Sequence, residues 1–449
     1  MFRRLLLTCC LCLAFELRAQ APRQVAAPQP LPSSEGAAFV VKAGRLIDPE
    51  TGSSAVNQMI SVKDGRIIEI GPAVAIPQGA ETIDLSGYSV LPGLVDAHNH
   101  LALTYKKVPE NDFYYFTYVQ ESTALRAIEA ASNGMQMLSA GFTVVRDLGN
   151  NGLYADSALR QAIEQGWIPG PTLINSGIII GGYGGQFTPT PEMAKDHNIL
   201  YPEYLTADTR DEIIKAVRQN VLFGAKVIKI CVDCKPYPYS VDDMKLFIHE
   251  AANAGGLKVA GHVQTPEGAR RAIEAGIWSI EHDDGLNDEL NKLMAQKGIW
   301  RAGTETPTDY WGTPADFERT VAGMKSAWKY GVQMAFSTDA DYYVPGMSRG
   351  QLVIDFLKSW KAAGIPDKDI LKVMTINGYK ICDIYGNRGP LKPGFPADMI
   401  AVKGNPLQDI DALRSVAFVM KDGLVFKRDG VMTPERFLHG GPINGWKIH

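Results

Sequence analysis

Two histidines one residue apart, His98 and His100, follow an apolar run that is typical of a buried strand, residues 90–95. Because side chains alternate along a strand, both imidazoles point the same way and can bind one metal ion. The pair alone is a weak signal, since such pairs also occur on protein surfaces. Further polar side chains end apolar runs later in the chain: Lys229, His262, His282 and Asp339.

Each of these later side chains also has a simpler interpretation. A lone histidine such as His262 or His282 is more often a hydrogen-bonded core residue than a ligand. Lys229 can be a strand-end lysine whose charge reaches solvent, and Asp339 can cap a following helix. Yet four of the chain's eight histidines stand at these strand ends. All the simpler interpretations would have to hold at once, so we favour one shared site.

The donor types fit a hydrolytic site that holds two metal ions. Such a site needs about six donor groups and room for a bridging water. Neutral imidazoles and carboxylates suit Zn²⁺. The ammonium of Lys229 has no lone pair, but carboxylation by CO₂ would turn the side chain into an anionic oxygen bridge. Lys226 competes for this role, but it faces the other side of the strand and stands at its start, so we favour Lys229.

Residues 92–390 alternate short apolar runs with helical segments, which predicts an α/β fold with parallel strands. A helix is expected over 113–140 and a glycine-rich excursion over 181–205. Eight βα units predict a (β/α)8 TIM barrel, whose active site lies at the carboxyl ends of the strands. The strands expected after the first are 143–147, 172–176, 227–231, 258–262, 278–282, 299–304 and 333–339.

Both ends of the chain show a β pattern instead. Residues 38–91 and 391–435 alternate apolar and polar side chains, and each segment contains an Asp-Gly pair, at 64–65 and 422–423. Such pairs close two-residue hairpins. We expect the two segments to form one small β-sandwich built from both chain ends. The remaining segments are expected to be a signal peptide (1–20), a disordered linker (21–37) and a C-terminal tail (436–449).

The N-terminus has the pattern of an export signal. Arg3 and Arg4 precede an apolar run over 5–15 and a small-residue cleavage site near Ala19, as in a secretory signal peptide. The run is too short to span a bilayer, so no stable membrane anchor is expected. We predict export across the inner membrane to a bacterial periplasm. A net charge of −4 with no basic stripe argues against nucleic acid as a partner.

Three cysteines lie beyond the expected signal: Cys231, Cys234 and Cys382. An odd, sparse set does not form a disulfide scaffold. The spacing of Cys231 and Cys234 matches one half of a zinc knuckle, but the chain has no second pair. We favour a plain buried strand residue for Cys231, and a Cys231–Cys234 disulfide in an oxidising compartment is the alternative.

The full pattern resembles the amidohydrolase superfamily over nearly the whole mature chain. The motifs that carry the resemblance lie at 91–100 (Leu-Pro-Gly-Leu-Val-Asp-Ala-His-Asn-His), 227–230, 261–262, 281–282, 337–339 and 391–398. Residues 141–149 and the Ile-Lys-Ile strand are similar to the imidazolonepropionase-related branch. That branch includes Xaa-Pro and other dipeptidases, carboxypeptidase-like enzymes and ochratoxin-hydrolysing amidases.

The resemblance implies two divalent metal ions, expected to be Zn²⁺, bridged by N6-carboxylated Lys229. Asp339 would bind the first ion and act as catalytic acid and base. The imidazoles would divide between the ions, with His98 and His100 on the more buried one and His262 and His282 on the other. One motif departs from the pattern. Relatives often carry Gly-Gly-His-Gly after the third strand, where Tyr183 stands here, so a substrate-facing histidine is replaced.

The expected reaction is hydrolysis of an amide or peptide bond next to a C-terminal residue. The small-molecule substrate would be a dipeptide, an N-acyl amino acid or an ochratoxin-like amide. The alternative is a cyclic amide such as an imidazolone or lactam, a lactone or a phosphotriester, although export argues against an imidazolone. A non-catalytic metal-binding barrel is less favoured, because the ligand set is complete. Barrels of this type commonly assemble, so we expect a homo-oligomer.

Substrate contacts are expected from the loops at the barrel mouth. These loops are rich in tyrosine: Tyr105, Tyr183, Tyr237, Tyr239, Tyr310, Tyr342 and Tyr343. Aromatic walls suit an apolar or aromatic substrate group, although tyrosines are also common on large loops. From this set we predict substrate-binding roles for Tyr183, Tyr237, Tyr239 and Tyr342. Arg301 is predicted to hold a substrate carboxylate, with Lys235 as the alternative.

Overall fold

The computed structural model describes residues 38–105, 121–186, 191, 201, 203–234, 237–282, 284–307 and 313–433. All of these residues belong to one compact unit, Pro32–His449. The expected signal peptide, linker and C-terminal tail lie outside the described residues, as do Tyr310 and Lys235. Within the described ranges, we find no helix with the length and apolarity that a membrane span requires.

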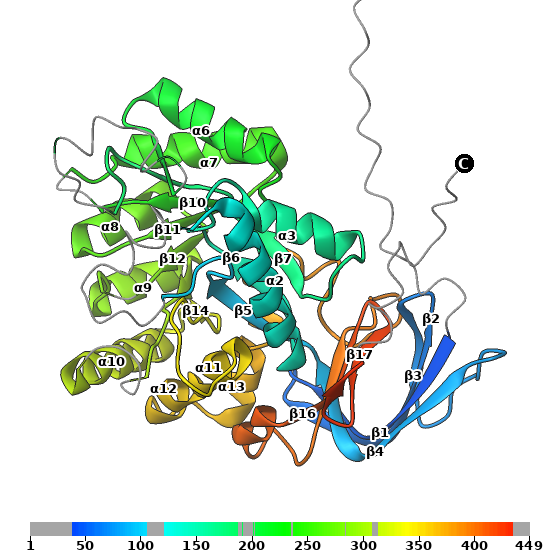
Figure 1. Cartoon of the computed structure of the whole chain (residues 1–449). Coiled ribbons are helices and arrows are strands. Elements are labelled where there is room, and N and C mark those ends of the chain that lie inside the picture. Colours follow the sequence, from blue (N-terminus) through cyan, green and yellow to red (C-terminus); the bar gives the residue numbers. More distant parts are fainter. Residues whose placement is uncertain are drawn as a thin grey trace, which may run out of the picture. The chain divides into compact units, whose positions relative to one another are not determined.

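The two ends of the chain form one eight-stranded sheet (Figure 1). Strand β4 joins them, because it pairs in parallel with β1 on one side and antiparallel with β15 on the other. The order is β18-β17-β16-β15-β4-β1-β2-β3. The strands are β1 (Ala38–Asp48), β2 (Ser53–Lys63), β3 (Arg66–Gly71), β4 (Glu81–Pro92), β15 (Met399–Val402), β16 (Val416–Lys421), β17 (Leu424–Arg428) and β18 (Val431–Met432).

Both predicted Asp-Gly hairpins are confirmed. Lys63 pairs with Arg66 across the first loop, and Lys421 pairs with Leu424 across the second. All four loop residues have positive φ, between 50° and 77°, as this type of tight turn requires. Apolar side chains of both chain ends share one core, including Val41, Ile60, Met399 and Phe418.

Parallel strands occupy the middle of the chain, in two sheets of orders β5-β6-β7 and β14-β13-β12-β11-β10-β8-β9. Their bounds are β5 (Leu94–Asn99), β6 (Phe142–Asp147), β7 (Thr172–Asn175), β8 (Ile179–Gly181), β9 (Tyr204–Thr206), β10 (Ile228–Cys231), β11 (Val259–His262), β12 (Ser279–Glu281), β13 (Trp300–Ala302) and β14 (Gln333–Met334). Backbone hydrogen bonds connect the sheets at two places, from Ala97 N to Phe336 O at 2.8 Å and from Lys226 N to Asn175 O at 2.7 Å.

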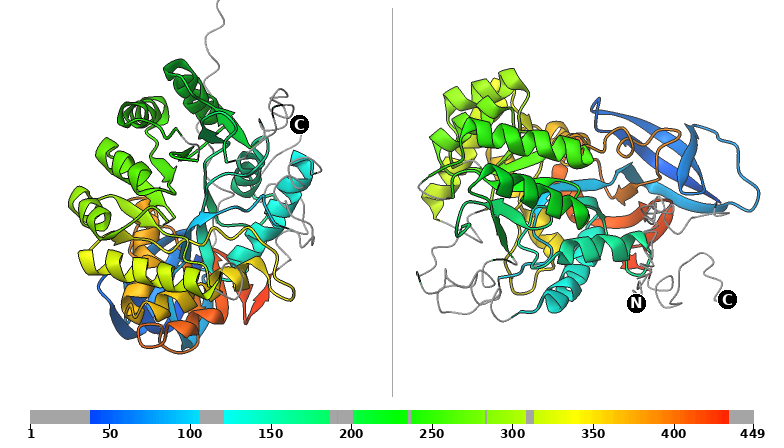
Figure 2. Two further views of the ribbon diagram at one scale, coloured as in Figure 1. Left: turned by 90° about the vertical axis from the view of Figure 1, so that its left-hand side faces the viewer. Right: turned by 90° about the horizontal axis from the view of Figure 1, so that it is seen from above.

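Helices separate the parallel strands along the chain and lie around their outer side (Figure 2). Local sequence determines many of their ends. Helix α7, for example, begins after Ser240, whose side chain forms a reciprocal capping box with Asp243, and ends at Gly256 in the left-handed conformation. The helices are α2 (Thr123–Ser139), α3 (Ala155–Glu164), α6 (Arg210–Leu222), α7 (Val241–Gly255), α8 (Pro266–Ala275), α9 (Asp288–Lys297), α10 (Pro314–Tyr330), α11 (Arg349–Asp355), α12 (Leu357–Ala362), α13 (Asp367–Val373) and α14 (Ile376–Ile381).

The structure corrects three details of the expected strands and helices. The helix expected over 113–140 is described as α2, which begins at Thr123 after the N-cap Ser122. Strands β8 and β9 were not expected; they overlap the two ends of the glycine-rich excursion, at 181 and at 204–205. The eighth strand is shorter than expected, since β14 ends at Met334. Residues after it still bond to β5, through Asp339 N to His98 O at 2.8 Å.

Candidate metal centre

A cavity of about 330 Å³ lies at the carboxyl ends of the parallel strands. All six predicted ligand residues line it: His98, His100, Lys229, His262, His282 and Asp339. His98, Lys229 and His262 belong to β5, β10 and β11, His100 and His282 directly follow β5 and β12, and Asp339 lies five residues after the end of β14. The structure therefore brings together side chains that are spread over more than half of the sequence.

The tightest group in the cavity is formed by His98, His100 and Asp339. Asp339 Oδ1 lies 2.7 Å from Nε2 of His100 and 3.3 Å from Nε2 of His98. The three side chains offer one donor atom each, all within 4.8 Å of one another. Two imidazole nitrogens and a carboxylate oxygen are ligands that Zn²⁺ prefers, so this group fits a metal ion.

Both imidazoles of this group have their other nitrogen occupied. His98 Nδ1 lies 2.9 Å from Glu281 Oε2, and His100 Nδ1 lies 2.8 Å from the carbonyl oxygen of Gly149. An acceptor at Nδ1 favours the tautomer whose Nε2 carries the lone pair. The Nε2 atoms of both histidines therefore face Asp339 and are the atoms that a metal ion would bind.

Glu281 is itself held by a buried cation. Arg146 Nη2 donates to both carboxylate oxygens, at 2.9 and 3.0 Å, and neither side chain is exposed. Burial alone would raise the pKa of Glu281, but Arg146 and His98 lower it to about 2. Glu281 thus remains ionised and orients His98, as the carboxylate partners of metal-bound histidines do. This role of Glu281 was not predicted, although the residue precedes the predicted ligand His282 directly.

A second pair of imidazoles lies beside the first group. The ring of His282 is centred 5.0 Å from that of His98 and 4.3 Å from that of His262. His282 Nδ1 lies 2.9 Å from the hydroxyl oxygen of Thr304. Burial and neighbouring positive charge lower the pKa of both His262 and His282, to about 3 for His262, so both rings are neutral and able to bind a metal ion.

Lys229 lies between the two groups of imidazoles. Its Nζ is 3.4 Å from Nε2 of His98, and the residue is only 2% exposed. Burial lowers the pKa of Lys229 to about 8. A neutral amine is the form of lysine that adds CO₂, so the surroundings favour the modification that a bridging role requires. Lys226, the competing residue, is exposed at the start of the strand.

Three residues at the strand ends have an unusual backbone. His282, Thr304 and Asp339 have φ values of 72°, 53° and 53°. Left-handed conformations of residues other than glycine cost on the order of 1–3 kcal/mol each and persist only where the surroundings enforce them. Their concentration at one cavity is typical of a functional site.

Asp96 supports the first strand end from below the cavity. Its carboxylate accepts hydrogen bonds from Asn99 Nδ2 at 2.8 Å and from the Thr338 hydroxyl at 2.7 Å. These bonds tie β5 to the residues that precede Asp339. No role was predicted for Asp96. Its carboxylate directly follows an apolar run, which is the signal that could have indicated a structural role.

The predicted substrate residues lie elsewhere. Tyr239 is buried, and its hydroxyl donates to the carbonyl oxygen of Ala207 at 2.8 Å. Arg301 is 1% exposed and forms an ion pair with buried Glu305. Both placements correct the expectation, because neither side chain can reach a substrate from the core.

Three further tyrosines named as substrate contacts do not line the cavity as the described residues define it. Tyr183 and Tyr237 are exposed, and Tyr342 packs against the hydrophobic core. The cavity is lined instead by residues that were not predicted to contact the substrate: Tyr105, Asn150, Ile179, Gln186, Tyr204, Cys231, Gln264 and Asp341. Of these, Tyr105 was among the tyrosines noted in the mouth loops.

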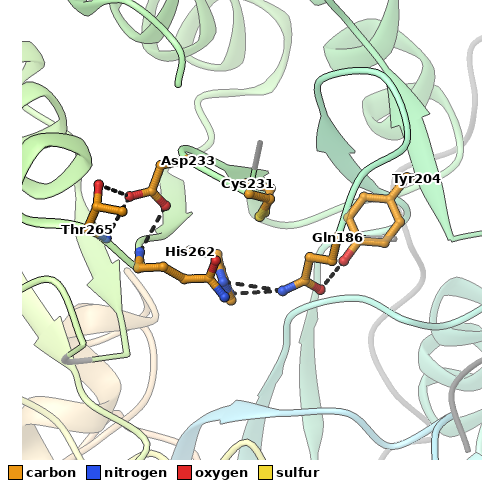
Figure 3. Close-up of a disulfide and its surroundings, with 8 residues drawn as sticks. Gln186, Tyr204, Cys231, Asp233, His262 and Thr265 are labelled. Carbon is orange, nitrogen blue, oxygen red and sulfur yellow. Dashed lines mark hydrogen bonds between the residues drawn. A yellow bond between two sulfur atoms is a disulfide. The ribbon is translucent and has the colours of Figure 1, made fainter. Parts of the chain in front are cut away.

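Gln186 contacts one of the predicted ligands directly. Its Nε2 lies 3.2 Å from Nε2 and 3.4 Å from Nδ1 of His262, and its Oε1 accepts a hydrogen bond from Tyr204 (Figure 3). An amide that approaches both ring nitrogens does not select one tautomer. His262 is therefore less firmly oriented than the other three imidazoles.

The comparison with known proteins agrees with this arrangement. Residues 89–425 match the model of the amidohydrolase family, and the chain belongs to that family. It is 28% identical to ochratoxinase from Aspergillus niger over 448 residues, covering 89% of this chain and 88% of the relative. It is 22% identical to imidazolonepropionase from Kosmotoga olearia over 395 residues, covering 82% and 90% of the two chains.

A solved structure of a Xaa-Pro dipeptidase with bound methionine in the active site is also similar. The two structures superpose with a TM-score of 0.75 at 26% identity, over 87% of this chain and all of the other. Ochratoxinase is named for ochratoxin, and the Xaa-Pro dipeptidase for Xaa-Pro dipeptides. The resemblance predicted from the motifs is thus confirmed at the level of the family and of its α/β fold.

Proposed function

We propose that this protein is a metal-dependent amidohydrolase with two metal ions, which cleaves an amide or peptide bond of a small molecule. The observation that carries the proposal is the convergence of His98 Nε2, His100 Nε2 and the Asp339 carboxylate, with both Nδ1 atoms already occupied. Such an arrangement places three donor atoms of types that Zn²⁺ prefers within 4.8 Å of one another in a cavity.

The residues divide into two sets of ligands in this proposal. His98, His100 and Asp339 would hold one divalent ion, expected to be Zn²⁺. His262 and His282 would hold the other, and N6-carboxylated Lys229 would bridge them. When bound, the two ions would supply an activated water and polarise the scissile carbonyl.

In this proposal, side chains of the protein transfer the proton and orient the metal ligands. The Asp339 side chain is 30% exposed at the cavity, so its carboxylate can accept the proton of the attacking water and deliver it to the leaving amine nitrogen. Burial by itself raises the pKa of Asp339, but His98 and His100 hold it well below its usual range, which keeps the carboxylate available as a base. Glu281 and Thr304 keep His98 and His282 oriented.

The relatives support the choice of bond. Ochratoxinase and Xaa-Pro dipeptidase are named for amide and peptide substrates, so a dipeptide, an N-acyl amino acid or an ochratoxin-like amide is the proposed substrate class. The similarity to imidazolonepropionase favours a cyclic amide as the alternative. A lactone or phosphotriester substrate is a further alternative that the same donor set can serve.

We extend the proposal to the architecture and setting of the enzyme. The hydrogen bonds from Ala97 to Phe336 and from Lys226 to Asn175 support one closed (β/α)8 barrel made of the two parallel sheets. The apolar core shared by both chain ends supports a small β-sandwich. The predicted segment boundaries, export to the periplasm and assembly into a homo-oligomer also remain proposals, which rest on the sequence.

The test is a substrate screen with the zinc-loaded full-length protein. A panel of Xaa-Pro and other dipeptides, N-acyl amino acids, aromatic amides such as ochratoxin A, and lactams is incubated, and products are identified by mass spectrometry. Amide cleavage that stops on chelation and returns with zinc supports the proposal. Cleavage of lactams alone would favour the cyclic-amide alternative, and protein that binds no metal would overturn the reading of the ligand set.

A further inference from the structure

A pair of cysteines lies beside His262, and the proposed reaction uses neither. Cys231 is the last residue of β10 and is the cross-strand partner of His262 on β11. Cys234 follows three residues later, and the two form a disulfide with a Cα–Cα distance of 5.7 Å. The prediction that favoured a plain strand residue for Cys231 is wrong in this respect, and the alternative, a disulfide, is confirmed.

The cysteines and His262 form a compact set of donors. Both sulfur atoms and a ring nitrogen of His262 lie within 4.8 Å of one another. Cys231 also lines the cavity that holds the candidate metal centre, two residues after Lys229 on the same face of β10 (Figure 3). Two cysteines and one histidine, with two residues between the cysteines, are a donor set and spacing that bind Zn²⁺.

The backbone around the pair is fastened to the strand that carries His262. Asp233, between the cysteines, accepts hydrogen bonds from the backbone N of Gln264 at 2.9 Å and from Thr265 N at 2.7 Å (Figure 3). Val232 N donates to the carbonyl oxygen of His262 at 3.0 Å. None of these bonds depends on the disulfide, so the loop would keep both sulfur atoms near the imidazole after reduction.

We propose that Cys231, Cys234 and His262 form a thiolate metal site when the disulfide is reduced, which takes a thiophilic divalent cation such as Zn²⁺ or Cd²⁺. A dithiol reductant transfers two electrons and two protons to the disulfide and becomes a disulfide itself. The cation then displaces the two thiol protons and bonds to two sulfur atoms and one imidazole nitrogen. Gln186 leaves the ring when the cation takes its place.

The proposed site competes for a ligand of the catalytic centre. The single lone pair of His262 cannot bind both cations. In the oxidised protein His262 is therefore available to the proposed catalytic centre, whereas in the reduced protein it binds the cation at the thiolate site. This consequence for turnover rests on the proposed function, whereas the thiolate site itself does not.

The test follows cadmium binding to the chain with Cys9, Cys10 and Cys12 replaced by serine, because thiolate–cadmium bonds absorb in the ultraviolet and these three thiols would add a band of their own. Metal-free protein is titrated with Cd²⁺ before and after reduction by a phosphine, which is oxidised to its oxide and then removed without oxygen. We expect the thiolate band only after reduction. Reduced Cys234→Ser is expected to lose the band. A reduced protein without the band would overturn the proposal.

Cys382 provides the matched control. It is a free and buried thiol, and burial raises its pKa to about 12, so reduced Cys382→Ser is expected to keep the full band. Loss of the band in this variant, but not in Cys234→Ser, would also overturn the proposal. In reduced His262→Gln, cadmium affinity is expected to fall by at least the roughly tenfold that the loss of an outer-shell partner costs. Unchanged affinity would remove His262 from the site.

Circular dichroism and thermal unfolding show whether each variant is folded. The substrate screen separates this inference from the proposed function. If the thiolate band appears and the control variants behave as expected, but no substrate is hydrolysed, the thiolate metal site is supported and the enzyme proposal is overturned. Hydrolysis without a thiolate band in the reduced protein would support the enzyme proposal and overturn the thiolate metal site.

Discussion

The two halves of the candidate metal centre differ in how firmly their ligands are held. Around His98 and His100, each Nδ1 has a partner at 2.8 or 2.9 Å, and neither ring depends on a flexible contact. In the other half, His282 is fixed by Thr304, whereas in the described part of the chain the hydrogen bonds of the His262 ring go to Gln186.

This difference indicates that the proposed centre would have one metal position built in advance and one that is adaptable. Oriented histidines bind a metal ion without losing rotational freedom, and their outer partners contribute to affinity. We therefore expect the ion at His98, His100 and Asp339 to bind more tightly than the ion at His262 and His282. The adaptable half is also the one beside the cysteine pair.

The largest effect is expected from Asp339→Asn. The amide can still offer an oxygen but cannot carry a proton, so turnover should fall by about 10²- to 10⁴-fold, the contribution typical of general acid–base catalysis. Metal content should stay largely unchanged. Kinetics on a cleaved substrate beside elemental analysis measures both. Asp341→Asn, in the same cavity, is the control, and an equal loss there would contradict the assigned role.

Glu281→Gln is expected to remove the charged partner that orients His98 in the firmly held half. Removing the charge leaves Arg146 buried without its ionic partner, which costs about 3–5 kcal/mol of unfolding free energy. Urea unfolding of the metal-free protein measures the change. The matched control is Glu81→Gln, whose partner Arg428 is on the surface, where an ion pair contributes at most about 1 kcal/mol. Equal losses in the two variants would contradict a buried, preorganised network.

Lys229 should make stability depend on pH. Its pKa is about 8 in the folded protein because of burial, against about 10.4 in an unfolded chain. Between these values the unfolded state binds more protons, so stability rises with pH, by at most about 1.4 kcal/mol per unit. Urea unfolding of the metal-free protein across this range should show the rise in wild type and in Lys226→Met. If Lys229→Met shows the same rise, another group causes it.

The smallest effect is expected from replacing the two residues that contact the imidazoles of the adaptable half. Thr304→Val removes the partner of His282 Nδ1 and should weaken the second metal ion by about tenfold, as the loss of outer-shell partners does. Gln186→Leu should leave that affinity near the wild-type value, because Gln186 must leave His262 before metal binds. Calorimetric zinc titration distinguishes the two. A larger loss in Gln186→Leu would reverse the assignment of which contact orients a ligand.

Much of the fold was accessible from local patterns. The Asp-Gly hairpins, the alternation in the chain ends and the order of strands and helices follow from turn chemistry and periodicity. The expected ligands also reach one cavity, because the carboxyl ends of successive parallel strands meet on one side. Strands β8 and β9 were missed, since three-residue strands at the two ends of a glycine-rich segment carry no periodic signal.

The substrate side of the cavity was much less accessible. Residue type suggested Tyr239 and Arg301, but type does not say whether a side chain faces a cavity or the core. Arg301 meets Glu305 in the core, and Gln186 reaches His262 from a different segment. Such placements depend on how loops pack on the strand ends, which short-range spacing does not encode.

The residues alone limit the possible chemistry, through the donor types, their positions at the ends of apolar runs and the faces set by strand alternation. How each donor is used depends on the folded chain. Glu281 meets His98 across 183 residues of chain, and Cys231 stands beside His262 through the register of β10 against β11. The physical reason is that periodicity is local, whereas partners across strands depend on the register and packing of the whole fold.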